Sequence, residues 1–293
     1  MNDPATQGPA CTALDALLEI LPNVIDQYLP SLMEPMAGLL QTAPLHIKAV
    51  VVGAIGSAAH ASKEKFLPYF RPSMEFIQPF LSLSGEGEEI GLRGTTIVTI
   101  GTFAEAVGRD VFRPFLPESM KRAFEAVATE SSRLREHSFL FFGVAARVFQ
   151  EEFAPYLDLV VKALLESCKQ LENGEENALE ISALTSSVAA RQDNEDLDEE
   201  KMLEVNSAIA VEKEVAASTL GKIFAATKAH FLPYVEPSVV ELVSLLSHHY
   251  EGIRRSAVRS ILEMIRTFYE LSDPPKWVAG SNAVCFSLRS RMT

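Results

Sequence analysis

Apolar residues along most of the chain recur every three or four positions, which is the spacing of one face of an amphipathic helix. One such stripe contains Ile97, Ile100, Phe103 and Val107, and similar stripes occupy residues 52–59 and 139–149. A strand would instead alternate apolar and polar residues, and no long segment of the sequence does so. The pattern predicts an all-α fold.

A short phrase of an aromatic residue, any residue and a proline recurs between these helical stretches. It occurs as QYLPSL, KFLPYF, VFRPFL, EFAPYL and HFLPYV, with the prolines at Pro30, Pro68, Pro114, Pro155 and Pro233. Successive prolines are 38, 46, 41 and 78 residues apart. Proline suits the first turn of a helix because the N–H that it lacks would have no partner there. Each phrase is therefore expected to join one helix pair to the next.

Two further features keep a fixed distance from these prolines. A glycine stands 12 or 13 residues before four of them, at Gly56, Gly101, Gly143 and Gly221. A basic residue stands eight residues before each glycine, and a fifth copy of the pattern has Glu263 in place of glycine. The five basic residues are Lys48, Arg93, Arg135, Lys213 and Arg255. A period near 40 residues fits HEAT or armadillo units and disfavours 34-residue tetratricopeptide units, so the sequence predicts an α-solenoid of two-helix repeats. We expect a right-handed α-solenoid of HEAT repeats built from antiparallel helix pairs.

The expected organisation is a flexible leader at residues 1–10, a solenoid at 11–278 and an irregular tail at 279–293. The solenoid would contain about five helix pairs after a lone first helix. The 78-residue interval contains an acidic insertion, placed at residues 172–211. Residues 172–214 include 13 acidic and three basic side chains, and so carry −10 of the net charge of −13. This segment is expected to be a disordered acidic run, with a short helix packed on the solenoid as the alternative.

The charge indicates which kind of partner the chain binds, and the cysteines indicate the kind of compartment. A net charge of −13 argues against a general binder of nucleic-acid phosphates and favours basic partners. The three cysteines are far apart in the sequence and odd in number, which fits buried thiols in a reducing compartment better than disulfides. No signal sequence or membrane-spanning segment is predicted.

Signals of catalysis, metals and cofactors are weak. The sequence contains no GxxxxGK[ST] phosphate-binding loop and no GxSxG nucleophile elbow. The histidines are scattered or, at His248 and His249, adjacent without a matching ligand cluster. We therefore predict a protein that is not an enzyme and has no metal site and no cofactor.

Three of the repeat phrases resemble a known family. VVVGAIGSAAHASKEKFLPYF, TIVTIGTFAEAVGRDVFRPFL and EKEVAASTLGKIFAATKAHFLPYV are similar to central HEAT repeats of the importin-beta (karyopherin-beta) family, specifically of the importin-4 type. The last phrase directly follows the acidic interruption, as in that type. The resemblance covers roughly residues 11–278.

The resemblance implies a nuclear import receptor that shuttles between cytoplasm and nucleus. Such receptors bind basic nuclear-localisation segments, pass the Phe-Gly nucleoporins of the nuclear pore and release cargo when the GTPase Ran binds. For the importin-4 type it implies histones and ribosomal proteins as cargo.

The resemblance also suggests which residues bind cargo. If the second helix of each pair lines the concave side, four of its carboxylates would pair with basic cargo side chains: Glu105, Glu136, Glu214 and Glu263. The acidic run would contribute Asp196, Asp198, Glu199 and Glu200. Lys48, Arg93, Arg135, Lys213 and Arg255 are expected to form a structural ladder that binds carboxylates of the next repeat or loop carbonyls. In the alternative interpretation the carboxylates are solvated or form intramolecular ion pairs, and the acidic run is a solubilising linker.

A static HEAT scaffold that organises a multiprotein complex is the competing function. Such a scaffold would bind a folded partner through its loops and would show no preference for isolated basic peptides.

Overall fold

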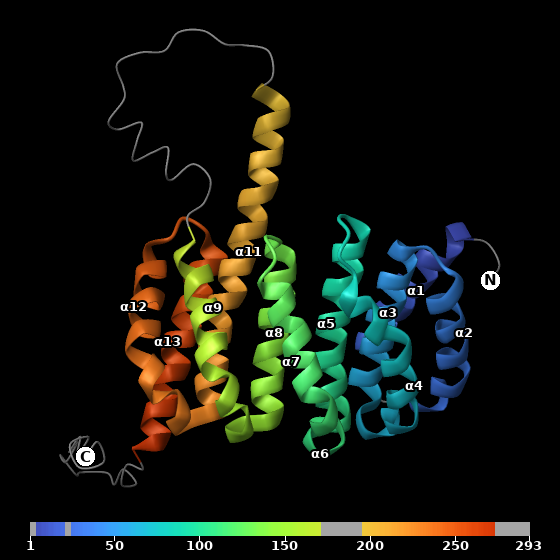
Figure 1. The fold of residues 1–293 in the computed structure, drawn as a ribbon, viewed down its shortest axis with the longest axis horizontal. Helices are drawn as coiled ribbons and strands as arrows, with labels where there is room; N and C mark the ends of the chain where they lie inside the picture. Colours follow the sequence, from blue (N-terminus) through green and yellow to red (C-terminus); the bar gives the residue numbers. More distant parts are fainter. Residues whose placement is uncertain (1–3, 21–24, 171–194, 273–293) are drawn as a thin grey trace.

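The computed structural model describes residues 4–20, 25–170 and 195–272 of the chain, and every regular element in these ranges is helical. The helices stand side by side along the long axis of the molecule, with α1 and α2 at one end and α12 and α13 at the other (Figure 1). The predicted all-α solenoid of antiparallel helix pairs is confirmed.

Within the described residues, helix α1 (Pro4–Ile20) is followed by five helix pairs. The first helices of the pairs are α2 (Leu29–Thr42), α4 (Leu67–Ile77), α7 (Leu116–Val127), α9 (Leu157–Lys169) and α12 (Val235–Ser244). The second helices are α3 (Leu45–Ser62), α5 (Glu88–Val107), α8 (Ser132–Phe149), α11 (Glu195–Thr227) and α13 (Glu251–Leu271).

The aromatic-x-Pro phrases lie at the junctions between pairs. They lie in or directly beside short 3₁₀ turns, and three of these turns follow a second helix, namely η2 (Lys63–Phe66), η5 (Gln150–Tyr156) and η6 (Lys228–Tyr234). A residue with positive φ opens each of these three turns and ends the α-helix there. The aromatic side chains of the phrases are fully buried at Phe66, Phe112, Phe153 and Phe231. The phrase is therefore a structural junction that fixes one repeat on the next.

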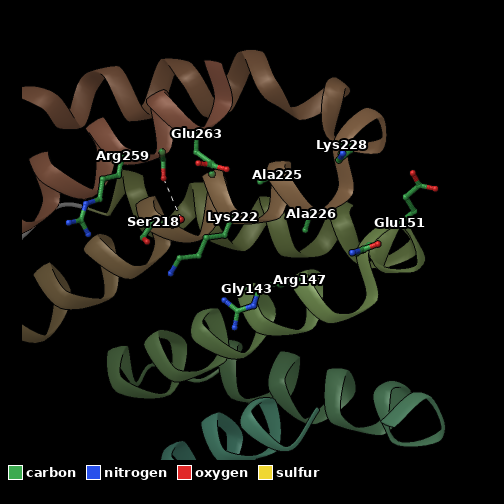
Figure 2. Close-up of a pocket in the computed structure, with 13 residues that line it drawn as sticks. Gly143, Arg147, Glu151, Ser218, Lys222, Ala225, Ala226, Lys228, Arg259 and Glu263 are labelled. Carbon is green, nitrogen blue, oxygen red and sulfur yellow. Dashed lines mark hydrogen bonds between the residues drawn. The ribbon is translucent and has the colours of Figure 1, made fainter. Parts of the chain in front are cut away.

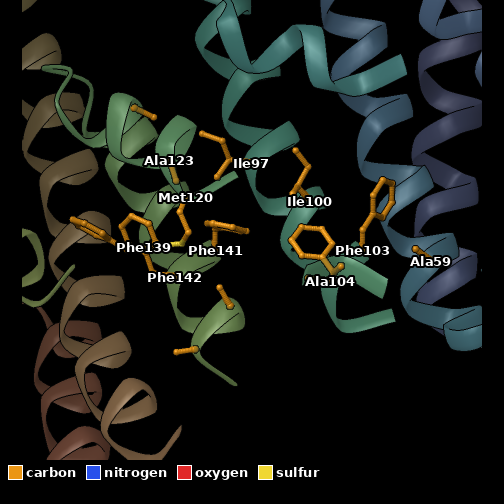
Figure 3. Close-up of a cluster of buried hydrophobic side chains, with 14 of the residues drawn as sticks. Ala59, Ile97, Ile100, Phe103, Ala104, Met120, Ala123, Phe139, Phe141 and Phe142 are labelled. Carbon is orange, nitrogen blue, oxygen red and sulfur yellow. The ribbon is translucent and has the colours of Figure 1, made fainter. Parts of the chain in front are cut away.

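The second helices pack closely against one another, whereas the first helices make few contacts among themselves. The more tightly packed layer lies on the concave side of a solenoid that curves, so we call the layer of second helices the inner surface and the layer of first helices the outer layer. The apolar side chains of α5, α7 and α8 form part of a continuous core between the layers (Figure 3).

The glycines of the repeat pattern permit this close packing. A Cβ atom at Gly221 of α11 would lie 2.8 Å from Cα of Ser260 in α13, a distance that real Cβ atoms essentially never show. A Cβ atom at Gly56 of α3 would lie 3.1 Å from Oγ1 of Thr99 in α5. The repeated glycine thus marks the crossing point of successive second helices.

The apolar helix α3 belongs to this core. By length and composition alone, a window in the continuous helical stretch Leu45–Ser82 could cross a membrane, with a mean hydropathy of 1.2. Half of that window is buried inside the solenoid, as is usual for a core helix.

The structure corrects two expected boundaries. Helix α1 begins at Pro4, inside the segment expected to be a flexible leader, because Gly8 and Cys11 pack into the solenoid core. Helix α11 begins at Glu195, so residues 195–211 belong to a second helix and not to a separate insertion. The end of this segment is fixed to the solenoid because Ile209 and Ala210 are buried. Residues 171–194 and the expected tail at 279–293 lie outside the described residues.

Two of the three cysteines can be placed. Cys11 and Cys168 are free thiols, and both are buried, as predicted. Cys285 lies outside the described residues.

Candidate functional site

Two of the predicted cargo-binding carboxylates lie in the middle of the solenoid. Glu105 of α5 accepts a hydrogen bond from Arg147 of α8, with 2.8 Å between Oε2 and Nη2. This ion pair joins neighbouring repeats, and both of its side chains are substantially exposed to solvent. Glu136 of α8 is half-buried and has no ion pair or hydrogen bond from its side chain to any described residue. Of the two, only Glu136 is free to meet a cationic partner.

The other two carboxylates also have partners within the chain. Glu214 of α11 accepts a hydrogen bond from Ser256 of α13, at 3.5 Å, and lies against the first turn of that helix. Glu263 of α13 lies 3.9 Å from Arg266 on the same helix. These contacts agree with the alternative interpretation, in which the carboxylates bind within the chain. Their role in binding cargo stays a prediction.

The acidic run occupies the first turns of α11. This end of the helix extends beyond the ends of the neighbouring helices (Figure 1). Acidic residues in the first turn of a helix interact favourably with the positive end of the helix dipole. The side chains of Asp196, Asp198, Glu199 and Glu200 lie outside the described residues, so only their position on the projecting part of α11 is known.

The predicted ladder of basic residues is only partly formed. Arg93 donates a hydrogen bond to the carbonyl of Leu83 in the loop before α5, at 3.2 Å. Burial lowers the pKa of Arg93, and the nearby Glu125 opposes this effect. The Lys48 ammonium lies 5.9 Å from the centre of the Phe80 ring and so makes a cation–π contact instead.

Arg135 binds a carboxylate of the next repeat, as the ladder predicts. Its Nε lies 2.8 Å from Oε1 of Glu212 in α11, and its Nη1 donates to the carbonyl of Thr129 at 2.9 Å. Ser167 of α9 donates to the same carboxylate oxygen at 2.6 Å. The Glu212 side chain is 1% exposed, so this cluster ties three helices together in the core.

In the last repeat the sequence pattern selects the wrong arginine. Arg254, not Arg255, donates to the loop carbonyls of His248 and His249, at 2.6 and 2.7 Å. Helix α13 begins at Glu251, which turns Arg254 toward the loop and Arg255 toward solvent. Arg255 lies 3.6 Å from Glu251 on its own helix. Lys213, the remaining ladder residue, is buried in α11.

The sequence did not predict one groove on the layer of second helices. This groove has a volume of about 680 Å³ and crosses α8, α11 and α13 (Figure 2). Four basic residues line it, namely Arg147, Lys222, Lys228 and Arg259, together with the two acidic residues Glu151 and Glu263. We call it the basic groove. The repeat pattern did point to part of this groove, because the repeated glycines Gly143 and Gly221 belong to its lining.

A smaller, apolar groove lies on the outer layer. It has a volume of about 240 Å³ and lies between the first helices α2 and α4. Its lining includes Met33, Ala37, Tyr69 and Phe76, and its one charged residue is Glu34. Aromatic and apolar side chains in such a groove suit an apolar peptide side chain.

In the described ranges, no group of three or more His, Cys, Asp and Glu side chains is arranged to hold a metal ion.

Comparison with known proteins adds information about family and fold. A family model described as "Importin subunit beta-1-like, TPR repeats" matches residues 3–190. The chain is 43% identical to the probable importin subunit beta-4 of Schizosaccharomyces pombe over 290 residues, which are 94% of this chain and 27% of that protein. It is 28% identical to importin-4 of Homo sapiens over 223 residues, which are 72% of this chain and 20% of that protein.

Solved structures of Kap121p share the fold. The complex of Kap121p with Pho4p has a TM-score of 0.69 at 20% identity, and the match covers 89% of this chain and 25% of Kap121p. The complex with Nup53p has a TM-score of 0.68 over the same shares of the two chains. The chain thus spans about a quarter of the length of these similar proteins.

Proposed function

Because the chain belongs to the importin-beta family, we propose that it is part of a nuclear import receptor that shuttles between cytoplasm and nucleus with basic cargo. The observation that carries the proposal is the family match over residues 3–190, supported by the 43% identity to a probable importin subunit beta-4. Importins are transport receptors and not enzymes, and we propose no catalytic role for this chain.

We propose that the projecting acidic part of α11 helps to bind the cargo. Five of the first six residues of this helix are acidic: Glu195, Asp196, Asp198, Glu199 and Glu200. One exposed ion pair contributes about 0.2 to 1 kcal/mol, whereas micromolar binding needs about 8 kcal/mol. Many pairs must therefore act together, and the −10 charge of residues 172–214 provides them. Histones and ribosomal proteins have the basic segments that this surface would attract.

Peptide binding tests the role of the acidic run. The variant carries Glu195→Gln, Asp196→Asn, Asp198→Asn, Glu199→Gln and Glu200→Gln, which removes five charges and keeps side chains of similar size. We expect a labelled histone-tail peptide to bind at least tenfold more weakly to this variant at about 50 mM salt, and the difference to shrink at higher salt. Fluorescence anisotropy measures both affinities.

The matched control removes five exposed carboxylates from the first helices on the outer layer. These are Glu34, Glu75, Asp158, Glu166 and Glu236, and none of them has a side-chain partner in the described part of the chain. If the control weakens binding as much as the acidic-run variant does, only total charge matters. If neither variant changes the affinity, the acidic run does not bind cargo.

The apolar groove between α2 and α4 supports a second proposed contact, with Phe-Gly nucleoporins. Kap121p, which has the same fold, has been solved with Nup53p. In this chain, Tyr69 and Phe76 would hold a phenylalanine side chain between neighbouring first helices. A static scaffold would have no use for such a contact. Release of cargo by Ran also belongs to the proposal for the whole receptor.

A pull-down on immobilised Phe-Gly peptides tests this contact. Ala37→Glu places a charge in the groove and is expected to abolish retention of the chain. Gln41→Glu adds the same charge on an exposed position of α2 that does not line the groove, and should leave retention intact. Equal retention of both variants would place the Phe-Gly contact elsewhere.

A further inference from the structure

We propose that the basic groove across α8, α11 and α13 binds an acidic peptide segment of a partner protein. This site is separate from the cargo contact proposed above, because it attracts the opposite charge and lies on different residues. The proposal does not depend on which basic cargo the chain carries.

The first argument is the arrangement of the cations. Arg147, Lys222 and Arg259 come from three successive second helices and all line one groove (Figure 2). Burial lowers the pKa of Lys222, and the nearby Arg147 and Arg259 lower it further. Because the three cations line one groove, their charges repel one another, and an anion between them would relieve that repulsion.

The second argument is the lack of internal counter-ions. In the described ranges, Lys222 and Arg259 have neither an ion pair nor a side-chain hydrogen bond, whereas Arg147 is bound to Glu105. Two cations held together without a carboxylate partner indicate an anionic ligand from outside the groove.

The acidic residues of the lining do not neutralise the end of the groove that contains Arg147, Lys222 and Arg259. Glu151 lies with Lys228 at the end of the groove away from Arg259 (Figure 2). Glu263 lies 3.9 Å from Arg266, a cation outside the groove. Glu105 compensates Arg147 alone, so Lys222 and Arg259 keep this end of the groove positive.

The third argument concerns the size and the floor of the groove. Neighbouring packed helices are about 8–10 Å apart, so three helices span about 16–20 Å. An extended peptide covers this distance with about five or six residues, at about 3.3 Å per residue. Gly143, Ser218, Gly221 and Ser260 line the groove where the second helices cross, so no long side chain rises into it from these positions. A single small anion would reach only part of such a groove.

A nucleic acid fits these observations less well. Its regular phosphates need a longer basic surface, and the net charge of −13 opposes a polyanion that extends beyond the groove. A short acidic peptide can place its carboxylates on the three cations and leave the rest of the surface free.

Anisotropy titration with a fluorescein-labelled decaglutamate peptide tests the proposal. The wild-type chain should bind the peptide, and Lys222→Glu/Arg259→Glu should weaken binding at least tenfold at about 50 mM salt. Lys222→Met/Arg259→Met, which removes the charges without adding repulsion, should have a smaller effect in the same direction. Because neither side chain belongs to the hydrophobic core or binds another described residue, circular dichroism and thermal unfolding of the variants should match the wild type.

The matched control is Lys121→Glu/Lys162→Glu, which makes the same charge change on exposed positions of the first helices α7 and α9. It should reduce binding far less than the groove variant. Equal loss in the two charge-reversal variants, or no binding by the wild type, would overturn the proposal. Tighter binding of a single-stranded oligonucleotide of the same charge would overturn it in favour of a nucleic acid.

One further outcome contradicts the proposal. If the decaglutamate peptide binds only after the acidic run at residues 195–200 is neutralised, repulsion by that run and not attraction by the groove decides binding, and the proposal fails. Because the cargo experiment uses a basic peptide and this one an acidic peptide, failure of either leaves the other intact.

Discussion

At the scale of single residues, Gly221 sets how closely two second helices can approach. A methyl group at this position would meet Cα and Oγ of Ser260 at 2.8 Å, and helix backbone cannot move away as easily as a flexible side chain. We expect Gly221→Ala to reduce the free energy of unfolding by about 1–3 kcal/mol because the helices must separate. Urea unfolding followed by circular dichroism measures the change.

Gly53→Ala is the matched control for this prediction. Gly53 is also in the middle of a second helix, but a Cβ atom there would lie 3.9 Å from Thr95, an ordinary contact. Alanine is the better helix former, so this substitution should be neutral or should stabilise the chain by up to about 1 kcal/mol. A similar loss of stability in both variants would show that close helix packing is not the cause.

Burial of Cys168 should make the stability of the fold fall at alkaline pH. Burial, with a smaller effect of Glu241, raises the pKa of this thiol from 9.0 to about 12. The unfolded chain therefore loses the proton at lower pH than the folded chain, and stability falls as the pH rises above 9. Between pH 8 and 10.5 this thiol should cost the fold about 2 kcal/mol. Urea unfolding at the two pH values measures the loss of unfolding free energy, which should be smaller by that amount in Cys168→Ala than in the wild type. If the variant loses as much stability as the wild type, the assignment to Cys168 is contradicted.

At the scale of helices, the sequence predicts the features that depend on neighbouring residues and recur in each repeat. The prolines and glycines mark junctions and crossings because each acts through its own backbone and its nearest neighbour. The start of α11 was not predicted because a run of acidic residues is as compatible with a helix as with disorder. The helix is anchored further along, where Ile209 and Ala210 are buried in the solenoid. Arg254 was missed because the start of α13, and not the repeat spacing, decides which arginine faces the loop.

Helix α13 carries an apolar stripe on its exposed side. Val258, Leu262, Ile265 and Tyr269 follow one another at helical spacing, and each is between 45% and 59% exposed in the described part of the chain. Such a stripe favours association with another apolar surface. We expect the chain to self-associate at high concentration, and Leu262→Lys/Ile265→Lys to shift it toward monomer with little loss of stability. Sedimentation velocity over a concentration series measures the shift, and an unchanged distribution would mean that the stripe is not the contact.

At the scale of the whole molecule, the distribution of charge could not be predicted from composition. A net charge of −13 predicts a negative inner surface, yet the basic groove lies on that surface. The reason is geometric. Arg147, Lys222 and Arg259 are far apart in the sequence, and only the stacking of three second helices brings them together. The carboxylates Glu105, Glu214 and Glu263 were correctly placed on second helices, but their partners come from the same or neighbouring helices, which a single repeat does not reveal.

Stability should also be distributed along the solenoid, because each repeat contacts only its neighbours. Phe70 packs on Phe103 and Phe115 in the N-terminal half, whereas Phe224 packs on Phe231 and Phe268 in the C-terminal half. Both side chains are almost completely buried, so truncation to alanine should remove about 3–5 kcal/mol locally. Hydrogen exchange measured by mass spectrometry can locate the loss.

We expect Phe70→Ala to speed amide exchange in α4, α5 and α7 while α13 keeps its protection, because no contact of Phe70 reaches the last repeat. Phe224→Ala should produce the converse, with faster exchange in α11 and α13 and protection retained in α4. The two variants control for each other, since they remove the same side chain from equivalent cores. If either one speeds exchange uniformly along the chain, the solenoid unfolds as a single cooperative unit, and the rigidity needed to bind partners on its inner surface is shared by all repeats.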